Sequence, residues 1–342
     1  MSAILIWGAG AIGGTIGAYL ARDGVEVILV DRDADHVAAM NRDGLKIEGP
    51  IDNFTVAARA CTPSEVSGVY DRIFLCVKAH HTDEAARALA PHLPDDGYVV
   101  SFQNGLNELV IAEVVGKART VGAFINFGAD YMGPGIVNFS GRGAFVVGEI
   151  DGAMSPRVQA LHLLVKRFEP NAIITDNILG YLWGKLGYGA LLFATALTNA
   201  SICDGLAALE PHPLFCRLAN EAVSVARALH VAPLGFNGYR PEAFVSAMPS
   251  AAADASFDAM VTHNAKSAKT HSGIWRDLAV RRRATEVDAQ LGPIVRFGGD
   301  VGIATPVTRE LIAMIHEIES GALPLQWSNL AELEKRSALP GV

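Results

Sequence analysis

Two patterns of apolar and polar residues divide the chain. From Ile4 to about Glu149, short runs rich in β-branched and aromatic residues alternate with stretches of helical periodicity. The runs predicted to be strands are AILIWG (3–8), EVILVD (26–31), RIFLCVK (72–78), YVVSFQN (98–104), TVGAFINF (120–127) and GAFVVGEI (143–150). Because strands that alternate with helices form βαβ units, we expect a parallel sheet with helices on both faces.

The pattern changes after the segment FEPNAIITDN (168–177). From Ile178 to about Glu332 it predicts a series of helices, which prolines separate, since proline ends one helix or opens the next. We therefore predict two domains, residues 1–174 and 175–336, followed by a short tail, 337–342.

Composition and charge exclude several classes of partner. The chain has 342 residues, 50% of them hydrophobic, which is enough for two domains with their own cores. A formal net charge of −8 gives no positive surface for nucleic acid or an anionic membrane. The longest apolar run, Leu186 to Thr198, is shorter than the roughly 20 residues that a membrane-spanning helix needs. The N-terminus lacks the pattern of a signal peptide, so we expect a cytoplasmic protein.

The cysteines and histidines predict no metal site. The four cysteines are scattered without a C-x-x-C pair, which is typical of a reduced protein. His80 and His81 are the one close histidine pair. Adjacent residues point to different sides of a helix or strand, so we interpret them as loop histidines.

A glycine motif follows the first predicted strand directly. Gly8, Gly10 and Gly13 stand in G-x-G-x-x-G register, and the predicted helix TIGAYLARDG (15–24) comes next. In such a motif the first glycine makes a tight turn, the second lets the backbone approach a pyrophosphate, and the third lets helix and strand pack closely. The pattern predicts a dinucleotide-binding Rossmann domain whose cofactor loop comprises Gly8, Ala9, Gly10, Ala11, Ile12 and Gly13.

The end of the second predicted strand carries two opposite signals for the cofactor. Asp31 lies about 20 residues after the glycine motif, where a carboxylate accepts hydrogen bonds from the adenosine ribose and repels a 2′-phosphate, which favours NAD. Arg32 follows at once and can pair with that phosphate, which favours NADP. Arg32 can equally be a solvated loop residue.

Six segments, in this order, resemble the ketopantoate reductase (2-dehydropantoate 2-reductase) family. They are GAGAIGG (8–14), CVKAHHTDEA (76–85), FQNGLNE (102–108), LWGKL (182–186), SGIWRDLAVRRRATEVD (272–288) and GIATP (302–306). The resemblance implies an α/β fold, an N-terminal Rossmann domain followed by an all-helical C-terminal domain, with substrate and nicotinamide meeting between the domains. It also implies NADPH as the usual reductant, with the family's cofactor arginine at Arg32. Asp31 departs from the family pattern, so NAD stays an alternative to NADP as the cofactor.

Lys185 is the single charged residue in the apolar stretch YLWGKLGYGALLFATALTNA (181–200). Reduction of a ketone builds negative charge on its oxygen, which a nearby cation can stabilise and then protonate. An apolar setting lowers the pKa of a lysine and makes its proton easier to donate. The resemblance places the family's catalytic lysine at Lys185. Without the resemblance, the commoner interpretation is a lysine whose side chain extends from a half-buried helix into solvent.

The resemblance also implies roles for other polar residues. Glu286 corresponds to the acid that contacts the lysine or the substrate hydroxyl, although it can be a carboxylate of a solvated charged face. Asn104 and Lys78 correspond to residues that bind nicotinamide, substrate or cofactor; an Asn-Gly turn and a surface lysine are the plain alternatives. Glu221 resembles a further acid near the site, but glutamates are ordinary in helices.

The substrate side departs from the family. One and two helical turns beyond the lysine, the well-studied members carry substrate-binding asparagines, where this chain has Gly189 and Phe193. The family's carboxylate-binding serine aligns with Gly273, although Ser272 is adjacent and can substitute. Compared with those family members, this chain has one more residue between Asp277 and Glu286. The substrate can therefore be a larger, more apolar 2-oxo acid than ketopantoate, and Trp275 or the arginines at 281–283 can help to recognise it.

These observations predict an NAD(P)-dependent oxidoreductase that reduces 2-dehydropantoate or a related small 2-oxo acid, with Lys185 as proton donor and Glu286 orienting it. Reduction of 2-dehydropantoate would belong to pantothenate biosynthesis. The alternatives are another two-domain dehydrogenase, of the opine or 3-hydroxyacid type, and a non-catalytic protein that senses NAD(P). The apolar helices of the second domain can form a core or the face of a homodimer.

Overall fold

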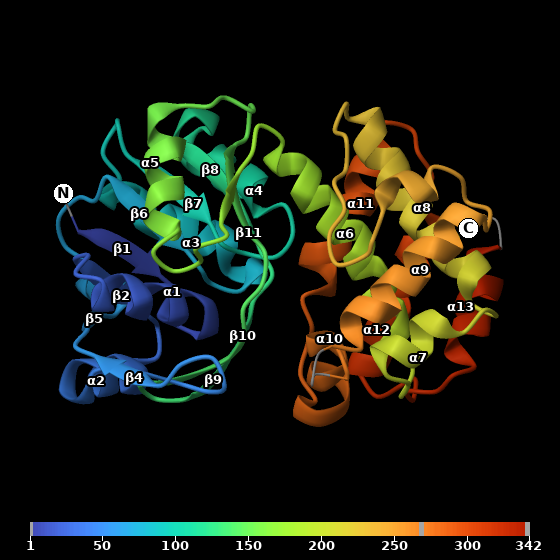
Figure 1. Ribbon diagram of the computed structural model, residues 1–342, viewed down its shortest axis with the longest axis horizontal. Coiled ribbons are helices and arrows are strands. Elements are labelled where there is room, and N and C mark those ends of the chain that lie inside the picture. Colours follow the sequence, from blue (N-terminus) through green and yellow to red (C-terminus); the bar gives the residue numbers. More distant parts are fainter. Residues whose placement is uncertain (1–2, 267–269, 339–342) are drawn as a thin grey trace. The chain divides into compact units, whose positions relative to one another are not determined.

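A computed structural model describes residues 3–266 and 270–338 of the chain. The chain forms two compact units, Met1–Ile178 and Leu179–Val342 (Figure 1). The predicted boundary between residues 174 and 175 lies just before helix α6 (Ile178–Thr195). Of the predicted tail, residues 339–342 lie outside the described residues, and Ser337 ends helix α13 (Asn329–Ser337).

The first unit is built on an eight-stranded sheet, and all six runs predicted from the sequence form strands in it. Its order is β12-β11-β8-β7-β6-β1-β2-β5. The strands are β1 (Ile4–Trp7), β2 (Val27–Val30), β5 (Arg59–Cys61), β6 (Arg72–Leu75), β7 (Tyr98–Ser101), β8 (Thr120–Ile125), β11 (Phe145–Glu149) and β12 (Ile173–Ile174).

The pairing of these strands is parallel from β5 to β8 and antiparallel between β8 and β11. The parallel prediction is therefore wrong for the run at 143–150. Parallel neighbours need a crossover connection, usually a helix. Between β8 and β11 the chain instead forms strands β9 (Gly128–Gly133) and β10 (Ile136–Gly141), so β11 returns in the opposite direction.

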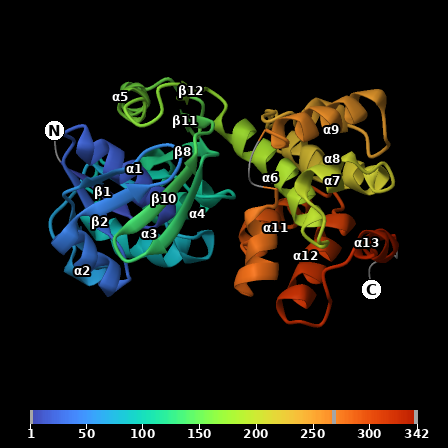
Figure 2. The same cartoon turned by 60° about the horizontal axis from the view of Figure 1, so that its bottom comes forward.

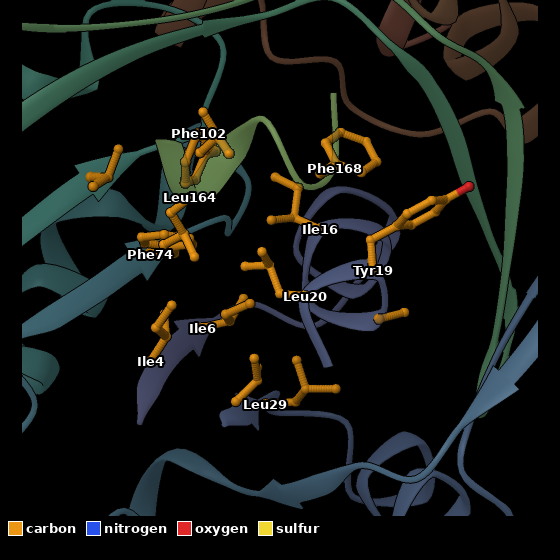
Figure 3. Close-up of a cluster of buried hydrophobic side chains, with 14 of the residues drawn as sticks. Ile4, Ile6, Ile16, Tyr19, Leu20, Leu29, Phe74, Phe102, Leu164 and Phe168 are labelled. Atoms are coloured by element: carbon orange, nitrogen blue, oxygen red, sulfur yellow. The ribbon is translucent and has the colours of Figure 1, made fainter. Parts of the chain in front are cut away.

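The predicted cover of helices on both faces is confirmed. Strand β1 is buried on both sides: Ile4 and Ile6 join one apolar cluster, and Leu5 and Trp7 join the other. The first cluster includes side chains of α1 (Ala11–Arg22) and α5 (Pro156–Val165), and part of it is drawn in Figure 3. The second cluster includes α3 (Thr82–Leu89) and α4 (Asn107–Val115). Helix α2 (Ala34–Asp43) follows β2.

A second sheet, which the sequence pattern did not predict, covers the outer side of α1. Its order is β4-β3-β10-β9, with β3 (Leu45–Glu48) and β4 (Phe54–Val56) contributed by the segment after α2. Helix α1 packs against β2 of the first sheet and against β9 and β10 of the second (Figure 1). Tyr19 of α1 fixes this contact, because its ring meets those of Phe54, Phe139 and Phe168 edge-on at 5.1 to 5.7 Å.

The second unit is helical over its described residues, as predicted (Figure 2). Prolines stand at helix starts: Pro211 is the N-cap of α8 and Pro306 is the first residue of α12. The elements after α6 are α7 (Ile202–Ala207), α8 (His212–Ala228), α9 (Ala251–Asn264), α10 (Gly273–Trp275), a π-helical segment (Arg276–Arg281), α11 (Val287–Asp300), α12 (Pro306–Glu319) and α13. No helix in the described parts of the chain is long and apolar enough to cross a membrane.

Helix α6 has a glycine face that a loop approaches closely. The amide of Leu234 donates to the carbonyl of Gly180 over 2.8 Å. A Cβ at Gly184 would lie 1.9 Å from the Leu234 carbonyl oxygen, and one at Gly187 would lie 2.3 Å from the Tyr239 hydroxyl. The glycines therefore let the segment around Leu234 pack directly on the helix backbone.

Two glycine substitutions in this helix should have opposite effects on stability. Gly184→Ala forces the Leu234 backbone away, and we expect it to lower the free energy of unfolding by about 2 kcal/mol. Among the described residues, the new methyl group of Gly189→Ala meets Gln290 Oε1 alone, at 3.8 Å, so this change should raise the free energy of unfolding by up to about 1 kcal/mol because alanine favours helix. Urea unfolding followed by circular dichroism measures both, and equal effects would contradict the packing described for Gly184.

Candidate active site

The predicted cofactor residues lie at one edge of the large sheet. The strand order reverses at β1, with β2 on one side and β6 on the other, and such a switch point is where open α/β sheets bind ligands. The loop 8–13 follows β1, Asp31 follows β2, Lys78 follows β6, and Asn104 follows β7. Because these strands are parallel, their carboxyl ends meet, and the fold brings all four segments to the same edge.

The three glycines of the loop have different surroundings. Gly8 has φ +101°, and a Cβ there would lie 2.7 Å from the Val77 amide. A Cβ at Gly13 would lie 2.0 Å from the Gly8 carbonyl oxygen. By contrast, no atom of the described residues lies within 4 Å of a Cβ placed at Gly10. The fold itself requires glycine at positions 8 and 13, whereas at position 10 it leaves the backbone accessible, which suits a pyrophosphate.

Gly10 is also the N-cap of α1, and Ala11 and Ile12 form the half-buried first turn. The first amides of a helix lack intrahelical acceptors and carry partial positive charge, so they attract phosphate. The loop thus fits a dinucleotide, although its role in binding one stays a prediction.

Ala9, between these glycines, is fixed through both of its backbone groups. Its amide donates to Asp31 Oδ2 over 3.0 Å. Its carbonyl oxygen lies 3.0 Å from Nε2 of His36, a residue of α2 with 1% exposure. The Gly135 amide donates to Nδ1 of the same imidazole over 2.9 Å, so Nε2 must carry the hydrogen that Ala9 accepts. His36, which the sequence did not single out, therefore joins the loop, α2 and the second sheet.

Asp31 and Asp33 organise the turn between β2 and α2. Asp31 Oδ1 accepts the Asp33 amide over 3.0 Å. Asp33 is the N-cap of α2, and its Oδ1 accepts the amides of Asp35 and His36 over 3.1 and 3.2 Å. The His36 amide is the main cause that lowers the pKa of Asp33. Arg32 between them is exposed.

A buried amide holds the segment that carries Lys78. Gln103, 4% exposed, donates from Nε2 to the Val77 carbonyl over 2.9 Å and to the Thr82 hydroxyl over 2.8 Å. Val77 precedes Lys78, and Thr82 begins α3 four residues later. Gln103 thus ties the loop after β6 to the loop after β7.

The same network reaches Asn104. Asn107 Nδ2 donates to the Asn104 carbonyl, and Thr82 Oγ1 lies 2.8 Å from Asn107 Oδ1. Gly105 has φ +97°, so Asn104 also begins the tight turn that an Asn-Gly pair favours. Both predictions for Asn104, a turn residue and an edge residue, are compatible. The sequence indicated Asn104 and Lys78, but the buried side chains that position them only became visible in the structure.

In the second unit, Lys185 lies on the half-buried face of α6. Tyr181, Lys185 and Gly189 are half-buried and stand one helical turn apart, while their neighbours along the helix are buried. Phe193, one turn further, is fully buried at 0% exposure. A substrate role for Phe193 stays a prediction, and in this structure its side chain is part of the core.

Helix α11 runs beside this part of α6 (Figure 2). The rings of Trp183 and Phe297 lie 6.2 Å apart, and Gln290 Oε1 lies 3.8 Å from where a Cβ of Gly189 would be. Glu286 is the N-cap of α11, and its carbonyl accepts the amide of Gln290 over 2.9 Å. Gln290, which the sequence did not indicate, therefore brings an amide group to the place that Gly189 leaves open.

Ser272 and Gly273 stand at the start of α10. Ser272 is 5% exposed, and its oxygen accepts the Trp275 amide over 3.1 Å as an N-cap. Its own hydroxyl hydrogen can still be donated, for example to a carboxylate. Gly273 has no atom of the described residues within 4 Å of a Cβ position, so it adds open space.

The segment after α10 pairs two of the three arginines with an acid. Arg281 and Arg283 both pair with Asp277, over 3.0 and 2.9 Å. The stretch Arg276–Arg281 is π-helical, and the wider turn of a π-helix holds more residues than an α-helical turn.

Glu221 has a structural role. It is 7% exposed, and its carboxylate accepts the amides of Val307 and Thr308 and the Thr308 hydroxyl over 2.6 to 2.9 Å. These donors belong to the first turn of α12, so Glu221 caps that helix. Burial raises the pKa of Glu221 despite these hydrogen bonds.

The described residues hold no group of three histidine, cysteine or acidic side chains that could bind a metal ion. The four cysteines are free thiols, and burial raises the pKa of Cys76, next to the glycine loop.

Comparison with known proteins gives the same family over both units. Residues 4–152 match the family described as ketopantoate reductase PanE/ApbA, and residues 177–319 match its C-terminal region. A 2-dehydropantoate 2-reductase from Pyrococcus abyssi is 35% identical over 184 residues, which span 53% of this chain and 59% of that protein.

Two solved structures share the fold over nearly the whole chain. The crystal structure of a PanE/ApbA family ketopantoate reductase from Ralstonia eutropha JMP134 is 29% identical with a TM-score of 0.77, covering 94% of this chain and 99% of that one. A ternary structure of D-mandelate dehydrogenase with NADH and anilino(oxo)acetate has a TM-score of 0.80 at 22% identity, with the same coverage.

The fold is thus common to enzymes named for different acids. Since both family regions are matched, and the glycine loop and Lys185 lie within them, the chain belongs to the ketopantoate reductase PanE/ApbA family.

Proposed function

We propose that this protein reduces a 2-oxo acid to the 2-hydroxy acid with NADH or NADPH. The family supports the reaction type, and one observation supports the site: the single lysine of the apolar helix α6 lies on its half-buried face, with an opening one turn further at Gly189. An ammonium group beside apolar side chains is costly to desolvate, so a reaction that uses its charge gives a reason for a lysine at this position.

When bound, the dihydronicotinamide supplies the hydride that adds to the carbonyl carbon. The electron pair of the carbonyl bond moves to the oxygen as the new C–H bond forms. The ammonium of Lys185 stabilises that oxygen and donates a proton to it, which leaves a neutral amine and a hydroxyl group. Glu286 orients the lysine or the hydroxyl, and Asn104 holds the nicotinamide and substrate.

The substrate we propose is a 2-oxo acid with a larger apolar group than ketopantoate. Gly189 has no side chain one helical turn from the lysine, and the neighbour that it meets among the described residues, Gln290, has a flexible side chain that can move. The hydroxyl of Ser272 and the open backbone at Gly273 suit the carboxylate. 2-Dehydropantoate itself, and a place in pantothenate biosynthesis, are the reference case against which this preference is measured.

Two other classes would use the same fold. An opine-type dehydrogenase would need an added amino acid for turnover. A sensor would bind the cofactor without any turnover, but it has no use for an ammonium group on an apolar helix, so Lys185 favours the enzyme.

Removing the proton donor should abolish most of the activity. We expect Lys185→Ala to lower kcat by about two to four orders of magnitude, with cofactor affinity nearly unchanged. The control is Lys335→Ala, which removes a 76% exposed lysine from α13. A steady-state assay of dihydronicotinamide absorbance measures both variants, and full activity of Lys185→Ala would rule out its role as the acid.

The glycine loop offers a matched pair for cofactor binding. Gly10→Ala places a methyl group where the pyrophosphate would lie, and we expect it to weaken dinucleotide binding by about tenfold or more without loss of thermal stability. Gly13→Ala collides with the Gly8 carbonyl and should lower the melting temperature as well. Calorimetric titration and thermal unfolding separate the two effects. Unchanged binding in Gly10→Ala would place the cofactor elsewhere.

Filling the opening at Gly189 should change substrate preference. Gly189→Asn should lower kcat/KM for 2-oxo acids with aromatic or longer apolar side chains by about tenfold, since a single obstructed pocket group is worth about 1 to 3 kcal/mol. It should affect the smaller ketopantoate less. Gly299→Asn, on an exposed position of α11, is the control. A panel of 2-oxo acids measures the ratio. Equal loss for all substrates would show that position 189 does not select among them.

A further inference from the structure

We infer that the turn between β2 and α2 selects NADH over NADPH, because the carboxylates of Asp31 and Asp33 lie where the adenosine ribose of a bound dinucleotide would be. The inference deepens the proposed function by naming its cofactor. It depends on dinucleotide binding at the loop 8–13 and not on which acid is reduced.

The first step is the position of Asp31. The carboxyl end of β2 adjoins the switch point, and the amide of Ala9, inside the glycine loop, holds Asp31 Oδ2 at 3.0 Å. The other oxygen accepts the Asp33 amide. Each oxygen keeps a lone pair for a further donor. A ribose hydroxyl can supply that donor, whereas a 2′-phosphate has mainly acceptor oxygens and close to two negative charges.

The second step concerns the N-terminus of α2, which would otherwise favour a phosphate. Asp33 caps this helix, and its Oδ1 already accepts the amides of Asp35 and His36. The donors that could bind an anion are therefore used by a carboxylate of the protein. The negative charge of Asp33 also offsets the positive end of the helix dipole.

The third step is the negative potential around this turn. The hydroxyl of Tyr131, on β9, donates to Asp33 Oδ2 over 3.1 Å. Burial, this hydrogen bond and the charges of Asp33, Asp31 and Asp35 together raise the pKa of Tyr131 to about 12. Three carboxylates thus act on one place at the surface, and a phosphate bound there would meet the same repulsion.

Arg32 is the cation that opposes them. It is exposed, and with His80 its charge contributes to lowering the pKa of His81, after the larger effect of burial. Arg32 therefore lies near the histidine pair that follows β6. Within the turn itself, Asp31, Asp33 and Asp35 outnumber Arg32, so the segment 31–35 carries a net negative charge. A lowered pKa keeps His81 mostly neutral at pH 7.

Equilibrium binding tests this without any turnover. The full chain is titrated with NADH and with NADPH by calorimetry, at low and at high salt. We expect NADH to bind at least about tenfold more tightly, the effect of a few like charges near a phosphate in a largely aqueous setting. High salt should narrow this difference, because ions screen exposed charges.

Variants assign the effect to the carboxylates. Asp33→Ser keeps a residue that caps helices and removes the charge, so NADPH affinity should rise by about tenfold and NADH affinity should change much less. Asp35→Asn, which leaves the cap in place, should shift NADPH affinity in the same direction by less. The control is Glu26→Gln, which removes a charge at the opposite end of β2 and should change neither affinity.

Tighter binding of NADPH than of NADH by the unaltered protein would overturn the inference, and a selective loss of NADPH affinity in Arg32→Gln would then assign phosphate recognition to Arg32. Binding of neither cofactor would overturn it as well. A protein that binds NADH preferentially but reduces no 2-oxo acid would refute the proposed reaction and support the cofactor selection.

Discussion

The fixed position of Ala9 is the constraint on which the first unit depends. Its amide and its carbonyl are bound by Asp31 and His36, and His36 is in turn bound by Gly135 of the second sheet. One short peptide thus connects the glycine loop, the start of α2 and the sheet that covers α1. Because Asp31 is part of this connection, the residue that we propose meets the ribose also shapes the loop that we predict binds the phosphates.

In the second unit, the two faces of helix α6 have different surroundings. On the buried face, Gly184 and Gly187 have no side chains, so a loop packs directly against the helix backbone. The half-buried face carries Lys185 and Gly189, beside α11 and its Gln290. A charged group can therefore stand on a helix that is otherwise apolar, since the packing that secures the helix is on the other side.

Local pattern was sufficient for six of the eight strands of the first sheet, the helical second unit and the conformation of the glycine loop, because periodicity and glycine spacing are features of consecutive residues. It failed where contacts are distant in sequence. In the second sheet β4 has only three residues, and β9 has two exposed side chains, Tyr131 and Met132, so neither strand stands out as a buried apolar run. The roles of His36 and Gln103 depend on partners in segments that are distant in the sequence. In sequence, the buried Glu221 that caps α12 resembles a functional acid.

The two faces of α6 also differ in how well they tolerate substitution. Every other amino acid has a Cβ, so any replacement of Gly184 meets the Leu234 carbonyl and lowers the free energy of unfolding. At Gly189 a new side chain finds room among the described residues, so the fold tolerates a change there. Under the function proposed above, changes on the open face would alter which acids are accepted, while the closed face keeps the helix, and the lysine on it, in place.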